Sequence, residues 1–403
     1  MRTLRDFNLK GKRVLVRCDF NVPLSEKGEI LDDFRIKLTI PTIEYLIEKG
    51  AKVILISHLE VDKKIKSLRP IAKKLEEALK KRVYPVKSSR SEVFAKGEQF
   101  NRVKFLPDCI GKKIQKEVGK LKEGEILLLE NLRFHKEEKE NDENFAQELS
   151  RLADIFVNEA FSCSHRNHAS IVGIPKFLPS VAGLLLEKEI KILSRVLENP
   201  EHPFVTIIGG IKPETKLKPA LNLLQKADHL LFGSKIGEAI LIGKKIILER
   251  EIRAEELAEK IDLTSPKIHL PIDGVIALKD LSEEYLRIGA VGTLKKDEEI
   301  YDIGPETIKI FKEIIKGAKT ILWNGPPGMH EDKRFEKGTK EILDAIVRNY
   351  SAFKIAGGGD TISVINKFGL FDKFDFISTG GGAMLEFIAG EKLPGIEALK
   401  MRY

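Results

Sequence analysis

The feature that most constrains the fold is an alternation of short apolar runs with longer amphipathic stretches, sustained along the chain. In the first half the apolar runs are RVLVRCDFNV, AKVILISH, EILLLENL and DIFVNEAF. Amphipathic segments such as LRPIAKKLEEALKK and NFAQELSRLA lie between them. Nearly continuous apolar runs predict strands that are buried on both faces, and helices between such strands make them parallel.

The second half repeats this alternation. Its apolar runs are PFVTIIGG, DHLLFG, KIHLPIDGVIAL, KTILWNGP, FKIAGGG and FDFISTGGG. No short repeat of fixed period is present, which argues against a solenoid. The sequence therefore predicts an α/β protein built from two doubly wound, Rossmann-like parallel sheets.

The length of 403 residues favours two domains over one. Proline and glycine interrupt the pattern near residues 174–183, and the following LLLEKEIKILSRVLENP predicts a long helix that connects the domains. We therefore expect an N-terminal domain over residues 1–180 and a C-terminal domain over residues 181–388. PTIEYLIEKG predicts a helix with Pro41 in its first turn, which leaves Arg35 shortly before that helix.

Composition excludes several classes of protein. The 69 basic and 61 acidic residues give a net charge of +8, but they are interleaved, which disfavours a nucleic-acid binder. No apolar run reaches transmembrane length, and MRTLRDFNLKGKRVLVRCDF lacks the apolar block of a signal peptide. The three cysteines lie far apart, as expected in a reducing compartment. We therefore expect a cytoplasmic protein that binds neither nucleic acid nor membrane.

Polar residues recur where the strands of the first half end. Ligands bind beyond the carboxyl ends of parallel strands, so these side chains are candidates for one site. They are Arg17, Asp19, Asn21, His58, Arg133 and Arg166, and Arg35, shortly before the first helix, joins them as a candidate. Several arginines with few carboxylates suit a small polyanion. The CSHRNH segment could suggest zinc, but it has no second ligand cluster, and Arg166 in its middle would repel a cation.

The strands of the second half end instead in glycine, in IIGGIK, WNGPPG, AGGGDT and STGGGA. Glycines at strand-to-helix turns expose amide groups to phosphate oxygens, so four such turns predict a nucleotide phosphate site. Neither a P-loop motif nor an early G-x-G-x-x-G is present. The stretch FKIAGGGDTISVI leaves two possibilities open: a tight turn, or a close approach to phosphate with Asp360 holding a metal ion.

Eight segments together resemble the motifs of the phosphoglycerate kinase family. They are RVLVRCDFNVPL, DDFRIKLTIPTIEYLIEKGAKVILISHL, LLLENLRFHKEE, VNEAFSCSHRNHAS, IIGGIKPETK, TILWNGPPG, GGGDT and STGGGAMLEF. The resemblance runs from about Lys12 to the C-terminus in the family's order. It implies reversible phosphoryl transfer between 1,3-bisphosphoglycerate and ADP, which gives 3-phosphoglycerate and ATP in glycolysis and gluconeogenesis. It also implies a monomer in which residues 389–403 pack back on the N-terminal domain.

The resemblance further implies roles for individual residues. In the N-terminal domain, Asp19 and Asn21 would hold hydroxyl and carboxyl groups of phosphoglycerate, and its charged groups would be held by Arg35, His58, Arg133 and Arg166. In the C-terminal domain the nucleotide would be bound by Lys212, Lys216, Asn324, Glu331, Gly357, Gly358, Gly359, Asp360 and Thr361. Asp360 would carry Mg²⁺, and Glu331 would take the ribose hydroxyls. Arg35, Lys212 and Lys216 would stabilise the transferring phosphoryl group once the two domains close.

Departures from the family's motifs lie in both halves. The family's usual SHLGRP is here SHLEVDKKIKSLRP, so that a glycine is lost and Val61 stands in place of an arginine that faces the substrate. We hypothesise that Lys63 or Lys64 replaces this arginine. AFSCSHR replaces the usual AFGTAHR, and FGSK and IYDIGP depart near the adenine side, which leaves the nucleotide base preference open. The alternatives are another small-molecule kinase on a similar two-domain scaffold, or a non-catalytic or nucleic-acid-binding protein that has kept the fold.

Overall fold

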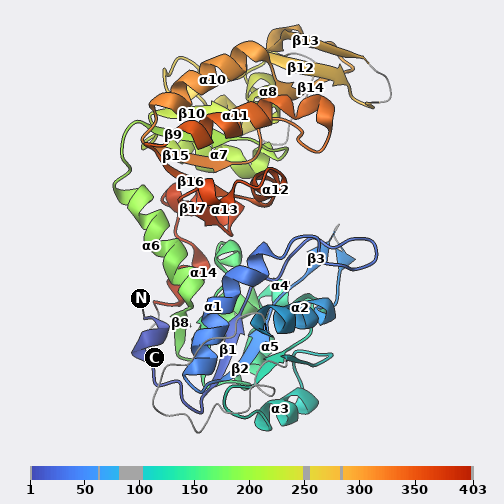
Figure 1. The fold of residues 1–403 in the computed structure, drawn as a ribbon, viewed down its shortest axis with the longest axis vertical. Coiled ribbons are helices and arrows are strands. Elements are labelled where there is room, and N and C mark those ends of the chain that lie inside the picture. The colour runs from blue at the N-terminus through green and yellow to red at the C-terminus, as the bar shows by residue number, and fades with distance from the viewer. Residues whose placement is uncertain (1, 62–63, 81–102, 248–254, 282–284, 401–403) are drawn as a thin grey trace. The chain divides into compact units, whose positions relative to one another are not determined.

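The structure is a computed structural model that describes residues 2–61, 64–80, 103–247, 255–281 and 285–400. By their internal contacts the residues separate into two units (Figure 1). Unit 1 consists of Met1–Lys191 and Lys392–Tyr403, and unit 2 consists of Ile192–Glu391. The division falls inside the long helix α6 (Leu184–Glu198), which occupies the segment predicted to connect the domains.

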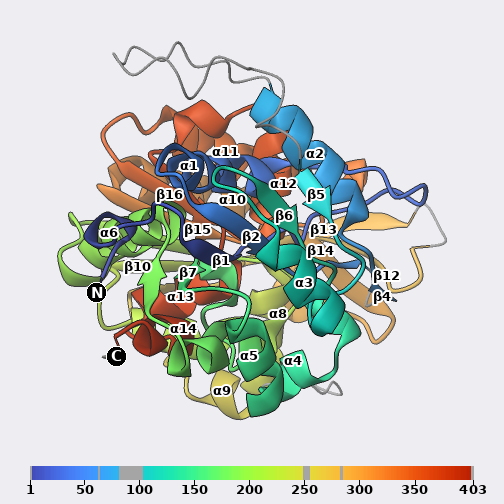
Figure 2. The same ribbon diagram turned by 90° about the horizontal axis from the view of Figure 1, so that it is seen from below.

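Unit 1 is built on a six-stranded sheet with the order β5-β6-β2-β1-β7-β8. Every pair of neighbouring strands is parallel. The strands are β5 (Val103–Phe105), β6 (Ile126–Leu128), β2 (Lys52–Ile56), β1 (Arg13–Arg17), β7 (Ile155–Asn158) and β8 (Ser180–Ala182). Figure 2 shows helices on both sides of this sheet, with α1 (Phe34–Glu48) and α2 (Arg69–Lys80) on one side, and α3 (Lys112–Gly119), α4 (Glu137–Glu140) and α5 (Glu143–Ser150) on the other.

Unit 2 contains a second parallel sheet, with the order β11-β10-β9-β15-β16-β17. Its strands are β11 (Ile268–His269), β10 (His229–Phe232), β9 (Phe204–Ile208), β15 (Thr320–Asn324), β16 (Phe353–Gly357) and β17 (Phe376–Ser378). Its helices are α7 (Pro213–Leu223), α8 (Ser234–Gly243), α9 (Glu255–Glu259), α10 (Pro305–Gly317), α11 (Lys337–Arg348), α12 (Gly359–Lys367) and α13 (Gly381–Ile388). Side chains of α10, α11 and α12 share one core with β9 and β15. The predicted fold class of two doubly wound parallel sheets is therefore confirmed.

One predicted strand of unit 2 is wrong. KIHLPIDGVIAL was expected to form a single strand, but it forms β11 in the parallel sheet and β12 (Asp273–Leu278) in a separate antiparallel sheet. Pro271 lies between them, and proline cannot donate a ladder hydrogen bond. The antiparallel sheet has the order β13-β12-β14, with β13 (Leu286–Ala290) and β14 (Glu298–Ile303) flanking β12.

The predicted start of the first helix is also wrong. Helix α1 begins at Phe34, and Pro41 lies in its interior rather than in its first turn. The helix gains an earlier start because Asp32 accepts a hydrogen bond from the Phe34 amide (2.7 Å), and Lys37 N–H bonds to the Asp33 carbonyl (3.0 Å). Arg35 is therefore a residue of the first helical turn, which fixes the direction of its side chain.

Unit 1 also contains a short strand pair and a short C-terminal helix. Strands β3 (Glu60–Val61) and β4 (Lys64–Ile65) form an antiparallel pair directly after His58 and Leu59. Near the C-terminus, α14 (Pro394–Ala398) lies against the segment that follows β7, where the Gly395 amide donates to the Ser164 carbonyl at 2.8 Å. No helix in the described part of the chain is long and apolar enough to cross a membrane.

Candidate functional sites

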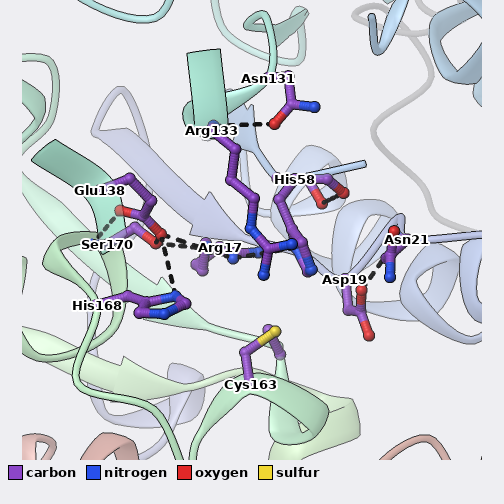
Figure 3. A network of polar contacts seen from close by, with 12 residues as sticks. Arg17, Asp19, Asn21, His58, Asn131, Arg133, Glu138, Cys163, His168 and Ser170 are labelled. Atoms are coloured by element: carbon purple, nitrogen blue, oxygen red, sulfur yellow. Dashed lines mark hydrogen bonds and ion pairs between the residues drawn. The ribbon is translucent and has the colours of Figure 1, made fainter. Parts of the chain in front are cut away.

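In unit 1 the polar side chains at the strand ends form one cluster. Arg17 is the last residue of β1, and Asp19 and Asn21 follow it. His58 follows β2, and Arg133 follows β6 on a short 3-10 helix. Figure 3 shows these side chains converging with those of the segment after β7, including Cys163 and His168. They meet because the carboxyl ends of parallel strands lie at one edge of the sheet. We call this set, with Arg35, His165 and Arg166, the basic cluster.

Asp19 holds Arg35 in the basic cluster. Arg35 Nη1 lies 2.8 Å from Asp19 Oδ2 and donates to the Asn21 carbonyl at 3.0 Å. The same carboxylate oxygen accepts a hydrogen bond from Ser162, and the other accepts one from the Asn21 amide at 3.0 Å. The Arg35 guanidinium is thus fixed from two directions, while its side chain remains partly exposed.

Arg17 is a buried member of the basic cluster, with none of its surface exposed. Its Nε donates to Ser170 Oγ at 2.7 Å, and Ser170 Oγ in turn donates to Glu138 Oε1 at 2.5 Å. Glu138 is itself buried, and burial raises the pKa of its carboxyl group although Arg17 opposes the shift. Arg17 therefore supports the cluster from within and is not positioned to contact a solvent-borne anion.

Three histidines in the basic cluster are held neutral. Burial and the positive charges of the surrounding arginines lower the pKa of His58 well below its usual value. The same causes lower the pKa values of His165 and His168 to about 4. Buried Nδ1 atoms of His165 and His168, and Nε of Arg133, have no hydrogen-bond partner in the described part of the chain. The Nε–H group of Arg133 is an unpartnered donor, and beside several guanidinium groups it favours an anionic ligand.

Sequence reasoning missed His165 and His168, because it considered them only as zinc ligands. Their position within two residues of Arg166, after an apolar run, was the signal that could have placed them in the anion site. Of the lysines proposed to replace the missing arginine, Lys63 lies outside the described residues. Lys64 is an exposed residue of β4.

In unit 2 the glycines at the strand ends serve two different purposes. A Cβ atom on Gly325 would lie 2.2 Å from the Gly209 carbonyl oxygen, and one on Gly381 would lie 2.6 Å from Gly358 Cα. These glycines let neighbouring turns pack backbone against backbone. Gly359 and Gly382, in contrast, have open space in front of them. We call the turns after β9, β15, β16 and β17 the glycine turns.

Lys216 and Asn324 join the glycine turns. Lys216 Nζ donates to Asn324 Oδ1, and Asn324 Nδ2 donates to the carbonyls of Gly357 and Gly381, both at 3.0 Å. Burial lowers the pKa of Lys216 to about 8, although the negative charge of Asp360 opposes the shift. Thr361 is fully buried, and its hydroxyl accepts a hydrogen bond from the Gly325 amide at 2.7 Å.

Other candidate residues of unit 2 are exposed. Asp360 lies in the first turn of α12, whose N-cap is Gly358 with a φ of 103°. Lys212 caps the N-terminus of α7. Glu331 is a surface residue 3.3 Å from His330 Nε2. The exposed carboxylate of Asp360, beside the open face of Gly359, fits a hard cation such as Mg²⁺, which takes one or two protein carboxylates and completes its shell with phosphate and water.

Comparisons with known proteins all agree. The family profile described as "Phosphoglycerate kinase" matches residues 4–391. A protein of that name from Dictyoglomus turgidum is 44% identical over 407 residues, which cover 98% of both chains. One from Aquifex aeolicus is 42% identical, over 98% of this chain and 96% of the relative. The crystal structure of phosphoglycerate kinase from Pyrococcus horikoshii OT3 superimposes with a TM-score of 0.83 at 33% identity, covering 99% of this chain and 98% of that one.

Proposed function

Because the chain belongs to the phosphoglycerate kinase family, we infer that it transfers a phosphoryl group reversibly between 1,3-bisphosphoglycerate and ADP. The products are 3-phosphoglycerate and ATP, and the reaction is a step of glycolysis and gluconeogenesis. The observation that carries this inference is the pairing of two different anion sites in one chain. Unit 1 holds arginines and neutral histidines, and unit 2 holds open glycine turns with a lysine and a carboxylate.

The basic cluster is the proposed phosphoglycerate site. The guanidinium groups of Arg35, Arg133 and Arg166 supply planar, permanently charged donors for phosphate and carboxylate oxygens. His58 is neutral because its pKa is lowered, and it is proposed to form a hydrogen bond with the substrate without taking up a proton. Asp19 and Asn21 are proposed to orient the hydroxyl and carboxyl groups of the substrate.

The glycine turns are the proposed nucleotide site. Amide groups of Gly357, Gly358 and Gly359 precede and begin helix α12, and a helix N-terminus attracts phosphate. Lys212 and Lys216 are proposed to contact the phosphates, Thr361 and Asn324 to fix the turns around them, and Glu331 to take the ribose hydroxyls. Asp360 would hold Mg²⁺, and the bound ion would neutralise negative charge on the phosphates.

The chemistry needs little covalent help from the protein. The acceptor is a carboxylate of 3-phosphoglycerate, which is already ionised at neutral pH, so that no general base is required. Catalysis then consists of positioning and of stabilising charge on the phosphoryl group in flight. Arg35 and Lys216 are proposed to provide that stabilisation, with Lys212 close by in sequence. We further propose a cytoplasmic monomer that binds neither nucleic acid nor membrane.

A coupled assay tests this function and the Mg²⁺ assignment together. The wild type is expected to consume 3-phosphoglycerate and ATP only when Mg²⁺ is present. Asp360→Ala is expected to lose most of its turnover, because the cation is then held only by nucleotide and water. Asp372→Ala, at an exposed acid of the same unit, is the matched control and should keep full activity. Wild-type kcat and Mg²⁺ dependence in Asp360→Ala would overturn the metal assignment.

A further inference from the structure

A carboxylate belonging to the protein itself occupies the basic cluster. Glu60 is the first residue of β3 and forms ion pairs with Arg133 and, at 3.2 Å, with Lys139. Partial burial acts to raise the pKa of Glu60, but its contacts with Lys139 and Arg133 outweigh this and hold the pKa below its usual range. Arg133 thus already has an anionic partner before any substrate arrives.

Glu60 marks a departure of this chain from the family. It stands where the SHLGRP motif has glycine, two residues after His58. A glycine has no side chain to reach Arg133, so the ion pair depends on this substitution. The Glu60 side chain makes the ion pairs, and the Glu60 backbone makes a separate contact: its amide donates to Asn21 Oδ1 at 2.8 Å. That contact survives any change of the side chain.

The acids that face the arginines of the basic cluster differ in how firmly they are held. Glu138 is fully buried and takes two hydrogen bonds from Ser170. Asp19 is 5% exposed and takes hydrogen bonds from Ser162 and the Asn21 amide as well as the Arg35 ion pair. The Glu60 side chain is 23% exposed and is held by two cationic side chains, one of them half exposed. Glu60 is therefore the acid that a competing anion can displace.

We propose that Glu60 sets the affinity of the basic cluster for phosphoglycerate by acting as a built-in competitor for Arg133. A bound phosphate or carboxylate must either break the Glu60–Arg133 pair or lie beside the Glu60 charge. Both outcomes weaken binding relative to a cluster with a free guanidinium. This inference rests on the proposed phosphoglycerate site.

The test is Glu60→Gln, which keeps the shape of the side chain and removes its charge. The KM for 3-phosphoglycerate is expected to fall roughly threefold to tenfold. This is the range expected when a partly buried ion pair no longer competes with the substrate for Arg133. The KM for ATP should stay the same, since ATP is proposed to bind unit 2. Glu140→Gln is the matched control, because Glu140 lies beside Lys139 but makes no ion pair among the described residues. Its KM values should equal those of the wild type.

Thermal unfolding supplies a second measurement. Without ligand, Glu60→Gln is expected to melt below the wild type, because Arg133 is 6% exposed and would lose its counter-ion. Saturating 3-phosphoglycerate should then raise the melting temperature more in the variant than in the wild type. Glu60→Gly, which restores the family's residue, should show the same change in KM. A KM for 3-phosphoglycerate that is unchanged or higher in both variants overturns the inference, whereas a wild type that does not turn over this substrate overturns the proposed function instead.

Discussion

Lys216 illustrates how one residue can be matched to a phosphate by its surroundings. Its ammonium group is partly buried at the glycine turns and bonded to Asn324, and this burial lowers its pKa to about 8. An ammonium group that is already partly removed from water binds a phosphate more favourably than a fully hydrated ammonium group does. It has fewer interactions with water left to lose when the phosphate binds. Lys212, which is exposed, lacks this advantage.

The pH dependence of activity should report on Lys216. Its pKa is lowered in the free protein, so its charge is present below about pH 8 and is lost as the pH rises through that value. Because kcat/KM follows the ionisation of the free enzyme, kcat/KM for ATP is expected to fall about tenfold per pH unit above the pKa. Lys216→Arg stays charged and should lack this alkaline decline, although at a lower overall level. Lys212→Ala should keep the decline, and a wild-type profile that is flat to pH 10 would contradict the assignment.

At the scale of elements, the glycines of the glycine turns fall into two groups that differ in the space around them. Gly325 and Gly381 are required by backbone packing between turns, so they would be needed even without a ligand. Gly359 and Gly382 lie in the first turns of α12 and α13 with open space before them. Those two positions need a reason other than packing, and a close phosphate is one.

Alanine substitutions should separate these two purposes. Gly381→Ala is expected to destabilise unit 2 by about 1–3 kcal/mol, because the new Cβ meets Gly358 backbone that cannot move freely. Gly382→Ala should preserve stability or raise it slightly, since alanine favours a helix, but should weaken binding of MgADP. Chemical unfolding followed by the fluorescence of Trp323, the one tryptophan of the chain, measures the first effect within unit 2. Calorimetric titration with MgADP measures the second, and unchanged affinity in Gly382→Ala would count against a phosphate at α13.

The sequence predicted those elements whose pattern is local. Parallel strands buried on both faces give continuous apolar runs, so most of β1 to β17 could be placed, and the residues after them were candidates for a site. The start of α1 was missed because an interior Pro41 mimics a first turn. β13 was missed because it alternates between exposed and half-buried residues. The Glu60–Arg133 pair could not be predicted, since it joins residues 73 positions apart through a side-chain contact.

For the molecule as a whole, each set of candidate residues lies within a single unit. The basic cluster belongs entirely to unit 1, and the glycine turns, Lys216 and Asp360 belong entirely to unit 2. Each unit also has its own sheet and its own core. Each substrate alone is therefore expected to bind to one unit and to stabilise that unit. The two ligands should thus stabilise different parts of the chain.

Hydrogen exchange with each ligand alone tests this division. 3-Phosphoglycerate is expected to slow exchange of amides near residues 17–21, 57–60 and 131–139, and MgADP to slow those near residues 209–216, 324–328 and 357–362. At 100 times its dissociation constant, a ligand that binds only the folded form stabilises it by about 2.7 kcal/mol. MgADP should therefore shift the Trp323 unfolding transition by about that amount, and 3-phosphoglycerate should shift it much less. Asp360→Ala should lose the MgADP effect while it keeps the protection by 3-phosphoglycerate in unit 1. Equal shifts of Trp323 unfolding by both ligands would mean that the two units unfold as one, because stabilisation of unit 1 would then reach a tryptophan that lies in unit 2.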